Sequence, residues 1–103
     1  MTRALEAWFG RGMARRRRLW AFDDGERGIL IEATAGMPAL QSVLARAERR
    51  VELGGTWVVE ASVGELNEMY DLVSVLMDAT RSRRRLDLLE GLLAGLCTSI
   101  DGF

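Results

Sequence analysis

Two seven-residue stretches with nearly the same pattern decide the predicted fold: LIEATAG at 30–36 and VVEASVG at 58–64. Each holds two apolar strand-forming residues, a Glu, an Ala, a hydroxyl residue, a small apolar residue and a Gly. Each is followed by a helical pattern that contains Ser-Val-Leu. We therefore expect two strand–helix units. They arise either by internal duplication or because short strand-to-helix junctions converge on similar residues.

The hydroxyl residue of each stretch is a predicted helix N-cap. Thr34 and Ser62 can each accept a hydrogen bond from an amide of the first helical turn. Glu65, three residues after Ser62, completes a capping box. Pro38 suits a first turn, where its missing N–H leaves no bond unmade. The first helix is therefore expected over about 38–53, and two glycines then end it.

A further strand is expected at 18–22, and the turn Asp23-Asp24-Gly25-Glu26 would connect it in a hairpin to 29–32. Glu32 and Glu60 would repel each other if their strands were adjacent. The preferred order therefore puts the 18–22 strand in the middle, with Arg18 between the two carboxylates. Alternation would then direct one set of side chains toward the helices: Leu19, Ala21, Ile29, Ile31, Trp57 and Val59.

The C-terminal third carries two helical patterns. The earlier stripe consists of Leu66, Met69, Val73, Leu76 and Thr80, and the later one of Leu86, Leu89, Leu93, Leu96 and Ile100. The two are out of phase by one residue, or about 100° of helix. We therefore expect a break at about 80–85, with Ser82 as the next cap, and an antiparallel helical hairpin.

These elements predict a small two-layer α+β domain over residues 1–103. Its three-stranded sheet, a β-hairpin followed by a β-α-β unit, packs with helices and is followed by the C-terminal helical hairpin. Strand order stays open. The N-terminal segment 1–17 has a weak helical pattern at 3–10, with Leu5, Trp8 and Phe9 on it.

The composition excludes several chemistries. The chain has no His, and its 14 basic residues are all Arg, so imidazole catalysis, His metal sites, Schiff bases and a P-loop Lys are absent. Cys97 is the only cysteine and lies in a Leu-rich segment, which predicts a buried, inert thiol. We expect no metal, no cofactor, no membrane partner, a cytoplasmic location and a non-enzymatic role.

Two arginine clusters are candidate sites for an anion or a nucleic-acid backbone: Arg15, Arg16, Arg17 and Arg18, then Arg81, Arg83, Arg84 and Arg85. The second cluster would lie at the positive end of a helix, where cations are unfavourable and an anion is welcome. The favoured alternative is that these arginines complement the end of the preceding helix or pair with Asp78, Asp87 and Glu90. The net charge of −1 gives no general attraction to nucleic acid.

Glu32 and Glu60, with Arg18, form either a ligand or catalytic site at strand ends or, as we favour, a row of ion pairs. A calcium site in the 23–26 turn is disfavoured because the spacing is wrong.

Surplus apolar surface predicts a homodimer. The helix-free face of the expected sheet would carry Trp20, Phe22, Leu30 and Val58, and the last helix, the N-terminal segment or a second copy of the protein must cover it. The last helix combines Leu88 and Leu92 with Gly91 and Gly95, whose small size permits close approach of another backbone. Alternatively, this helix is a central core helix. The leading hypothesis is a protein-interaction module acting as adaptor, inhibitor or regulator, with the arginine and glutamate sites as alternatives.

Overall fold

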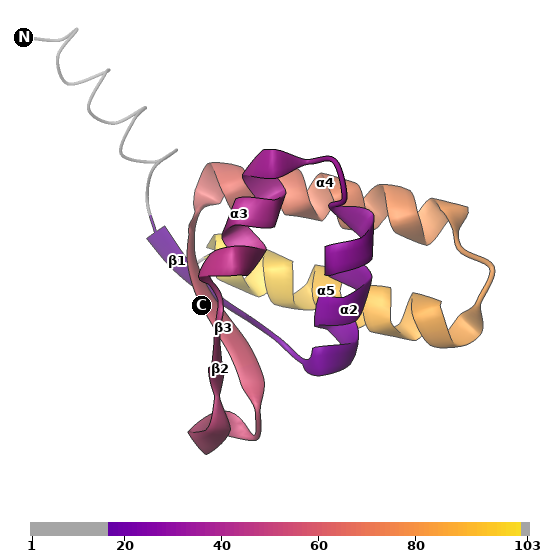
Figure 1. The fold of residues 1–103 in the computed structure, drawn as a ribbon. Coiled ribbons are helices and arrows are strands. Elements are labelled where there is room, and N and C mark those ends of the chain that lie inside the picture. The colour runs from indigo at the N-terminus through magenta and orange to yellow at the C-terminus, as the bar shows by residue number, and fades with distance from the viewer. Residues whose placement is uncertain (1–16, 102–103) are drawn as a thin grey trace, which may run out of the picture.

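Three strands and four α-helices follow one another over residues 17–101, the part of the chain that this computed structural model describes (Figure 1). Their order is β1 (Arg17–Phe22), α2 (Asp24–Ala33), α3 (Pro38–Arg46), β2 (Glu48–Arg50), the 3-10 turn η1 (Val51–Leu53), β3 (Thr56–Ser62), α4 (Val63–Ala79) and α5 (Arg83–Asp101). The α+β class, the three-stranded sheet and the C-terminal helical pair are confirmed. The expected helix at 3–10 lies outside the described residues.

The sheet is antiparallel throughout, and β3 is its central strand. β1 pairs along β3 from Arg17 opposite Ser62 to Phe22 opposite Trp57, and β2 forms a hairpin with β3. Gly54 and Gly55 in the hairpin loop have positive φ angles of 71° and 81°, which glycine adopts without strain. The preferred order with the 18–22 strand in the middle is therefore wrong, and no parallel β-α-β unit is formed by these strands.

Residues 29–32 are helical and not a strand. Asp23 accepts a hydrogen bond from the N–H of Glu26, and Glu26 Oε1 accepts one from the N–H of Asp23. This capping box starts α2, so the expected hairpin turn is a helix N-terminus. Thr34 consequently follows the end of this helix, where its buried hydroxyl donates to the carbonyl of Leu30 at 2.8 Å.

The helix expected over 38–53 ends at Arg46. Pro38 stands in its first turn as predicted, and the buried side of α3 carries Leu40, Val43 and Leu44. β2 follows immediately, with charged side chains that leave it exposed. Val51, expected on the buried stripe, is therefore 76% exposed at the tip of the hairpin.

The helical pair follows the prediction closely. Ser62 and Glu65 form the capping box of α4, with hydrogen bonds of 3.1 and 2.9 Å. α4 ends at Ala79 and α5 begins at Arg83, within the expected break. Ser82 accepts a hydrogen bond from the N–H of Arg85, so it caps α5 as predicted.

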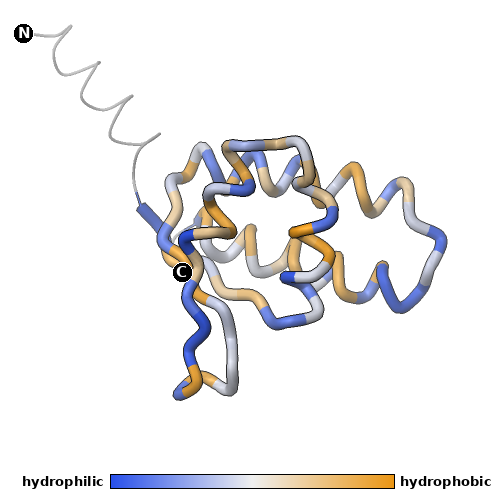
Figure 2. The backbone as a smooth tube through the Cα atoms, in the orientation of Figure 1, coloured by the Kyte–Doolittle hydropathy of each residue, from blue (hydrophilic) through white to orange (hydrophobic). Residues whose placement is uncertain are grey.

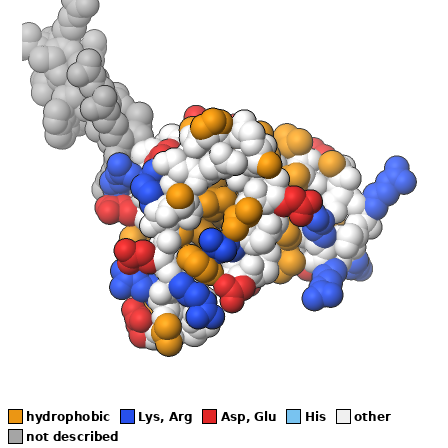
Figure 3. All heavy atoms as spheres, in the orientation of Figure 1, with side chains coloured by type: hydrophobic (Ala, Val, Ile, Leu, Met, Phe, Trp, Pro, Cys, Tyr) orange, Lys and Arg blue, Asp and Glu red, His pale blue; other side chains and the backbone are white. Residues whose placement is uncertain are grey.

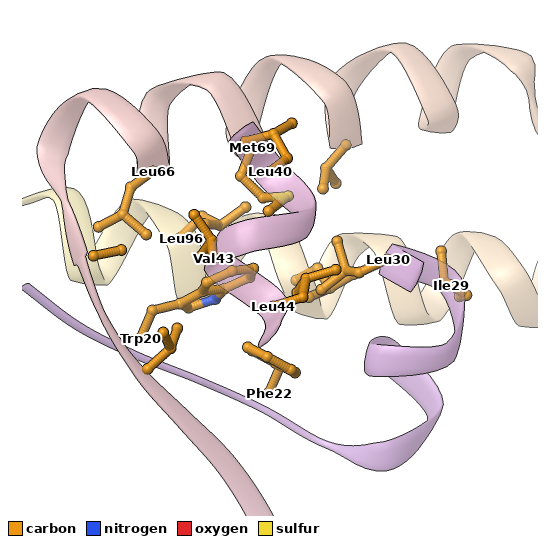
Figure 4. Packing of buried hydrophobic residues seen from close by; sticks show 14 of the residues in the cluster. Trp20, Phe22, Ile29, Leu30, Leu40, Val43, Leu44, Leu66, Met69 and Leu96 are labelled. Carbon is orange, nitrogen blue, oxygen red and sulfur yellow. The ribbon is translucent and has the colours of Figure 1, made fainter. Parts of the chain in front are cut away.

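Trp20 and Phe22 of β1 are buried beneath the helices, with their rings 4.6 Å apart, and the labelled core in Figure 4 shows them facing α3. The predicted alternation of β1 is therefore reversed. Two large aromatic side chains remove far more apolar surface from water than Leu19 and Ala21 would. In Figure 2 β2 is hydrophilic, whereas hydrophobic and hydrophilic residues alternate along the turns of the helices.

The glycines of α5 permit close packing inside the chain. A Cβ on Gly91 would lie 3.2 Å from Oε2 of Glu26 on α2, and one on Gly95 would lie 3.9 Å from the carbonyl oxygen of Ala21 on β1. Ser99 donates to the carbonyl of Leu19 at 2.8 Å. α5 thus contributes a hydrogen bond to the backbone of β1, which is an outer strand of the sheet.

Candidate functional site

One face of the sheet is not covered by any helix of residues 17–101. Side chains at alternate strand positions share a face, and the register places Leu19 beside Glu60 and Ala21 beside Val58, opposite in direction to Trp20. We call this surface the open sheet face. It consists of Arg17, Leu19, Ala21, Glu48, Arg50, Thr56, Val58 and Glu60.

The centre of the open sheet face is apolar and hollowed. Leu19 is 70% exposed, and Val58 on the neighbouring strand is half-buried. A hollow of about 430 Å³ lies over these residues, and charged side chains surround it: Arg17, Arg46, Glu48, Arg50 and Glu60. An exposed leucine framed by charges on a sheet is typical of a surface that binds another protein.

Two arginines share one carboxylate at one end of the face. Arg46 Nη2 lies 3.0 Å, and Arg17 Nη1 3.7 Å, from Oε1 of Glu65. Partial burial by itself would raise the pKa of Glu65. The hydrogen bond from the Ser62 N–H and the Arg46 guanidinium together outweigh this effect and lower that pKa. Glu65 thus stays ionised and holds both arginines at the rim.

The other end of the face carries mixed charges. Arg50 lies 3.6 Å from Glu48 and 3.5 Å from Glu52. The carboxylate of Glu60, by contrast, makes no ion pair with residues 17–101. Leu53 at the hairpin tip is 57% exposed, so the apolar surface continues beyond the sheet.

Most of the residues predicted for a dimer interface lie inside the domain. Trp20, Phe22, Leu30 and Leu92 are core residues, which corrects their assignment to an exposed surface. Leu88 is half-buried, and Gly91 and Gly95 face α2 and β1. Only Val58 lies on the open sheet face. Sequence analysis missed Leu19 because it assigned the wrong phase to β1, and the size of Trp20 and Phe22 was the signal that could have corrected it.

The structure does not bring Glu32 and Glu60 together. Glu32 lies on α2, where its Oε1 is 3.8 Å from Nη2 of Arg85, while Glu60 is exposed on β3. Arg18 lies opposite Ala61 on the helix-facing side of β1. The expected Glu–Arg–Glu row is therefore not formed, because 29–32 is a helix.

The arginine clusters are dispersed among acids. Arg15 and Arg16 lie outside the described residues, and Arg17 pairs with Glu65. Arg81, Arg83 and Arg84 are exposed and form no ion pair with residues 17–101, so the expected pairs with Asp78, Asp87 and Glu90 are absent there. Arg84 nevertheless lines a hollow with Asp23, Asp24 and Asp87. That surface is not uniformly positive.

Cys97 is exposed, which corrects its predicted burial. It follows buried Leu96 by one residue, which is about 100° around the helix. Within residues 17–101, no three His, Cys, Asp or Glu side chains are grouped to hold a metal ion. Within the same residues, no helix has the length and apolar character needed to cross a bilayer.

Comparison with known protein families, with curated proteins and with solved structures found no match to this chain.

Proposed function

We propose that this protein is a cytosolic, non-enzymatic protein-interaction module that forms a homodimer through its open sheet face. The observation that carries the proposal is Leu19, which is 70% exposed at the centre of a hollow on the uncovered side of the sheet. Covering this side chain removes apolar surface from water, at about 25 cal/mol per Å². A second copy of the chain is the occupant we assign to it.

Charge complementarity supports a second copy over other occupants. The hollow is lined by three arginines and two glutamates. A nucleic-acid backbone requires a predominantly positive surface, whereas a mixed surface is satisfied by another mixed surface of the same kind. A face that carries both signs can meet itself across a two-fold axis, which is the commonest symmetry of homodimers.

The sheet register suggests how two copies meet. Arg46 lies two residues before Glu48, the first residue of β2. Continuing the register of β2 along β3 therefore places Arg46 beside Glu60, just as Glu48 lies beside Val58. Suppose that two open sheet faces meet across a two-fold axis that runs perpendicular to the strands and passes between Glu60 and Val58. Arg46 of one copy then lies over Glu48 of the other. The same operation puts Leu19 over Ala21, so a large side chain meets a small one, and it puts Glu60 over Val58, which costs the desolvation of one carboxylate in each copy. Each of these contacts occurs twice, as in any isologous interface.

The dimer is expected to be weak. Strand spacing of about 4.8 Å and a rise of about 3.3 Å per residue give a small footprint for a short three-stranded sheet. The exposed tip residues Val51 and Leu53 enlarge it. Interfaces below about 1,200 Å² of total buried area are typically transient. We therefore expect a dissociation constant of roughly micromolar order.

Sedimentation velocity over a concentration series tests the proposal. Wild-type protein should pass from monomer to dimer, and Leu19→Arg should stay monomeric because a bulky guanidinium, even with Glu60 beside it, would have to lose its water at the centre of the interface. Val75→Arg is the matched control, since Val75 is 64% exposed but lies on α4, away from the sheet face. It should dimerise like the wild type.

A second substitution tests the register. Glu48→Arg would face Arg46 of the other copy and should weaken the dimer several-fold, with a larger effect at low salt. Circular dichroism should show that both variants fold. A wild-type protein that is monomeric at every concentration, or a Leu19→Arg variant that still dimerises, would refute the proposed interface.

A further inference from the structure

A second hollow lies between α2 and α3, on the side of the domain away from the open sheet face. It has a volume of about 260 Å³ and is lined by Arg27, Ile31, Thr34, Gln41, Leu44 and Ala45. Figure 3 views this side of the molecule and shows hydrophobic side chains gathered around a basic one where α2 and α3 meet β3. The hollow thus combines apolar walls with a single cation.

Arg27 is held in place by an aromatic ring. Its guanidinium carbon lies 3.9 Å from the ring centroid of Trp57, in a cation–π contact. The indole Nε1–H of Trp57 donates to Asp24 at 2.6 Å, and Asp24 also lies 3.5 Å from Arg49. The ring that supports Arg27 is therefore anchored from its other end.

Arg27 forms no ion pair with residues 17–101, although Asp24, one turn earlier on α2, is close enough for the Arg27 charge to contribute to lowering the pKa of that carboxyl. No acidic oxygen of residues 17–101 lies within 4 Å of its guanidinium nitrogens. The side-chain amide of Gln41, across the hollow on α3, also makes no hydrogen bond there. Thr34 contributes no free hydroxyl hydrogen, because its hydroxyl donates to Leu30. Arg27, whose Nε is buried without a hydrogen-bond partner among the described residues, and Gln41 therefore line the same small hollow.

We infer that this hollow binds a small monocarboxylate with a short hydrocarbon chain. Arg27 matches a carboxylate because the guanidinium offers paired donors, and Gln41 can donate a further hydrogen bond. Ile31, Leu44 and Ala45 supply the apolar walls for the chain. A single cation with apolar walls favours a monocarboxylate over a phosphate.

Titration with butyrate tests the inference. The indole N–H resonance of Trp57, identified by its loss in Trp57→Phe, reports on the ring beneath Arg27 in ¹H–¹⁵N spectra. We expect butyrate to shift it saturably, and butyramide, which has the same shape but no charge, to bind at least about tenfold more weakly, as expected for loss of a charge-assisted hydrogen bond.

Two variants act on the hollow by different means. Arg27→Gln removes the charge and should weaken butyrate binding at least about tenfold. Ala45→Leu fills the apolar end with a larger side chain and should also reduce binding. Arg81→Gln is the control, because Arg81 is exposed and neither lines the hollow nor contacts Trp57 or Asp24, and it should bind butyrate like the wild type.

Three outcomes would overturn the inference: a linear, non-saturating shift with butyrate, equal binding of butyramide, or unchanged binding in both Arg27→Gln and Ala45→Leu. The readout is independent of the oligomeric state, so it can be repeated on Leu19→Arg. Failure here leaves the proposed dimer untouched.

Discussion

The stretches 30–36 and 58–64 share a sequence pattern but not a structure. LIEATAG ends α2 and continues into a turn, whereas VVEASVG is the end of β3 and the start of α4. Equivalent residues therefore have opposite surroundings. Leu30 is in the core while its counterpart Val58 is half-buried on the open sheet face, and Ile31 is exposed while Val59 is buried.

The position of the capping box explains the difference. Asp23 and Glu26 form one before the first stretch, so the helix has already started when Leu30 is reached. Ser62 and Glu65 form the other at the end of the second stretch, so the helix begins only there. The apolar residues of the first stretch therefore follow the helical period of 3.6, and those of the second follow the strand period of 2. A helix start signal outside a motif decides its structure.

The largest expected change in the free energy of unfolding comes from replacing the first apolar residue of a stretch, which is Leu30 in one and Val58 in the other. Leu30→Ala should lower the free energy of unfolding by about 3 kcal/mol, and Val58→Ala by about 1 kcal/mol or less. The next position should reverse this order, with Val59→Ala more costly than Ile31→Ala. Urea unfolding followed by circular dichroism measures all four. Equal rankings in the two stretches would mean that they share one structure.

The terminal glycines should respond with opposite signs. Gly36 has a φ of 84° in the turn after α2, so Gly36→Ala should cost about 1 kcal/mol. Gly64 lies exposed in the first turn of α4, where Gly64→Ala should be neutral or should stabilise by a few tenths of a kcal/mol. The urea midpoints of the two variants give the comparison directly. A stabilised Gly36→Ala would contradict the turn.

Much of the fold follows from local rules applied correctly. The capping box at Ser62, the buried stripe of α4 and the cap at Ser82 were each predictable, because each depends on neighbouring residues alone. Asp23 and Glu26 have the same spacing as Ser62 and Glu65. Because Asp23–Glu26 were interpreted as a hairpin turn and not as a capping box, residues 29–32 were predicted to be a strand, whereas they are helical.

The open sheet face was less predictable, because it depends on pairings between distant segments. β1 could be placed from its sequence, but its phase depends on burying Trp20 and Phe22 in a core to which all four later helices contribute. The three-residue strand β2 carries only charged side chains, so no apolar alternation marked it. Arg46 and Glu48 reach the face only because that hairpin exists. The alternation of the expected strands predicted a helix-free sheet face, but the residues that it assigned to this face from β1 were wrong.

The smallest expected effects come from the two capping-box glutamates, which should respond oppositely to pH. Partial burial against α5 raises the pKa of Glu26, and the charge of Asp23 adds to this, while the hydrogen bond from the Asp23 N–H opposes it. The pKa of Glu65 is lowered, because the Ser62 N–H and Arg46 outweigh its burial. Glu26→Gln and Glu65→Gln keep a hydrogen-bond acceptor in each box and remove the charge.

A raised carboxyl pKa in the folded state favours folding below the unfolded pKa, and this contribution is lost as the pH rises through the folded pKa. Glu26→Gln should therefore gain stability relative to the wild type as the pH rises from acid to neutral.

A lowered carboxyl pKa in the folded state stabilises the fold above the unfolded pKa, and this contribution is lost as the pH falls through the folded pKa. Glu65→Gln should accordingly be least stable relative to the wild type at neutral pH and approach it in acid. Thermal unfolding of the three proteins across this range measures both slopes, and slopes of the same sign would show that the two boxes have equivalent surroundings.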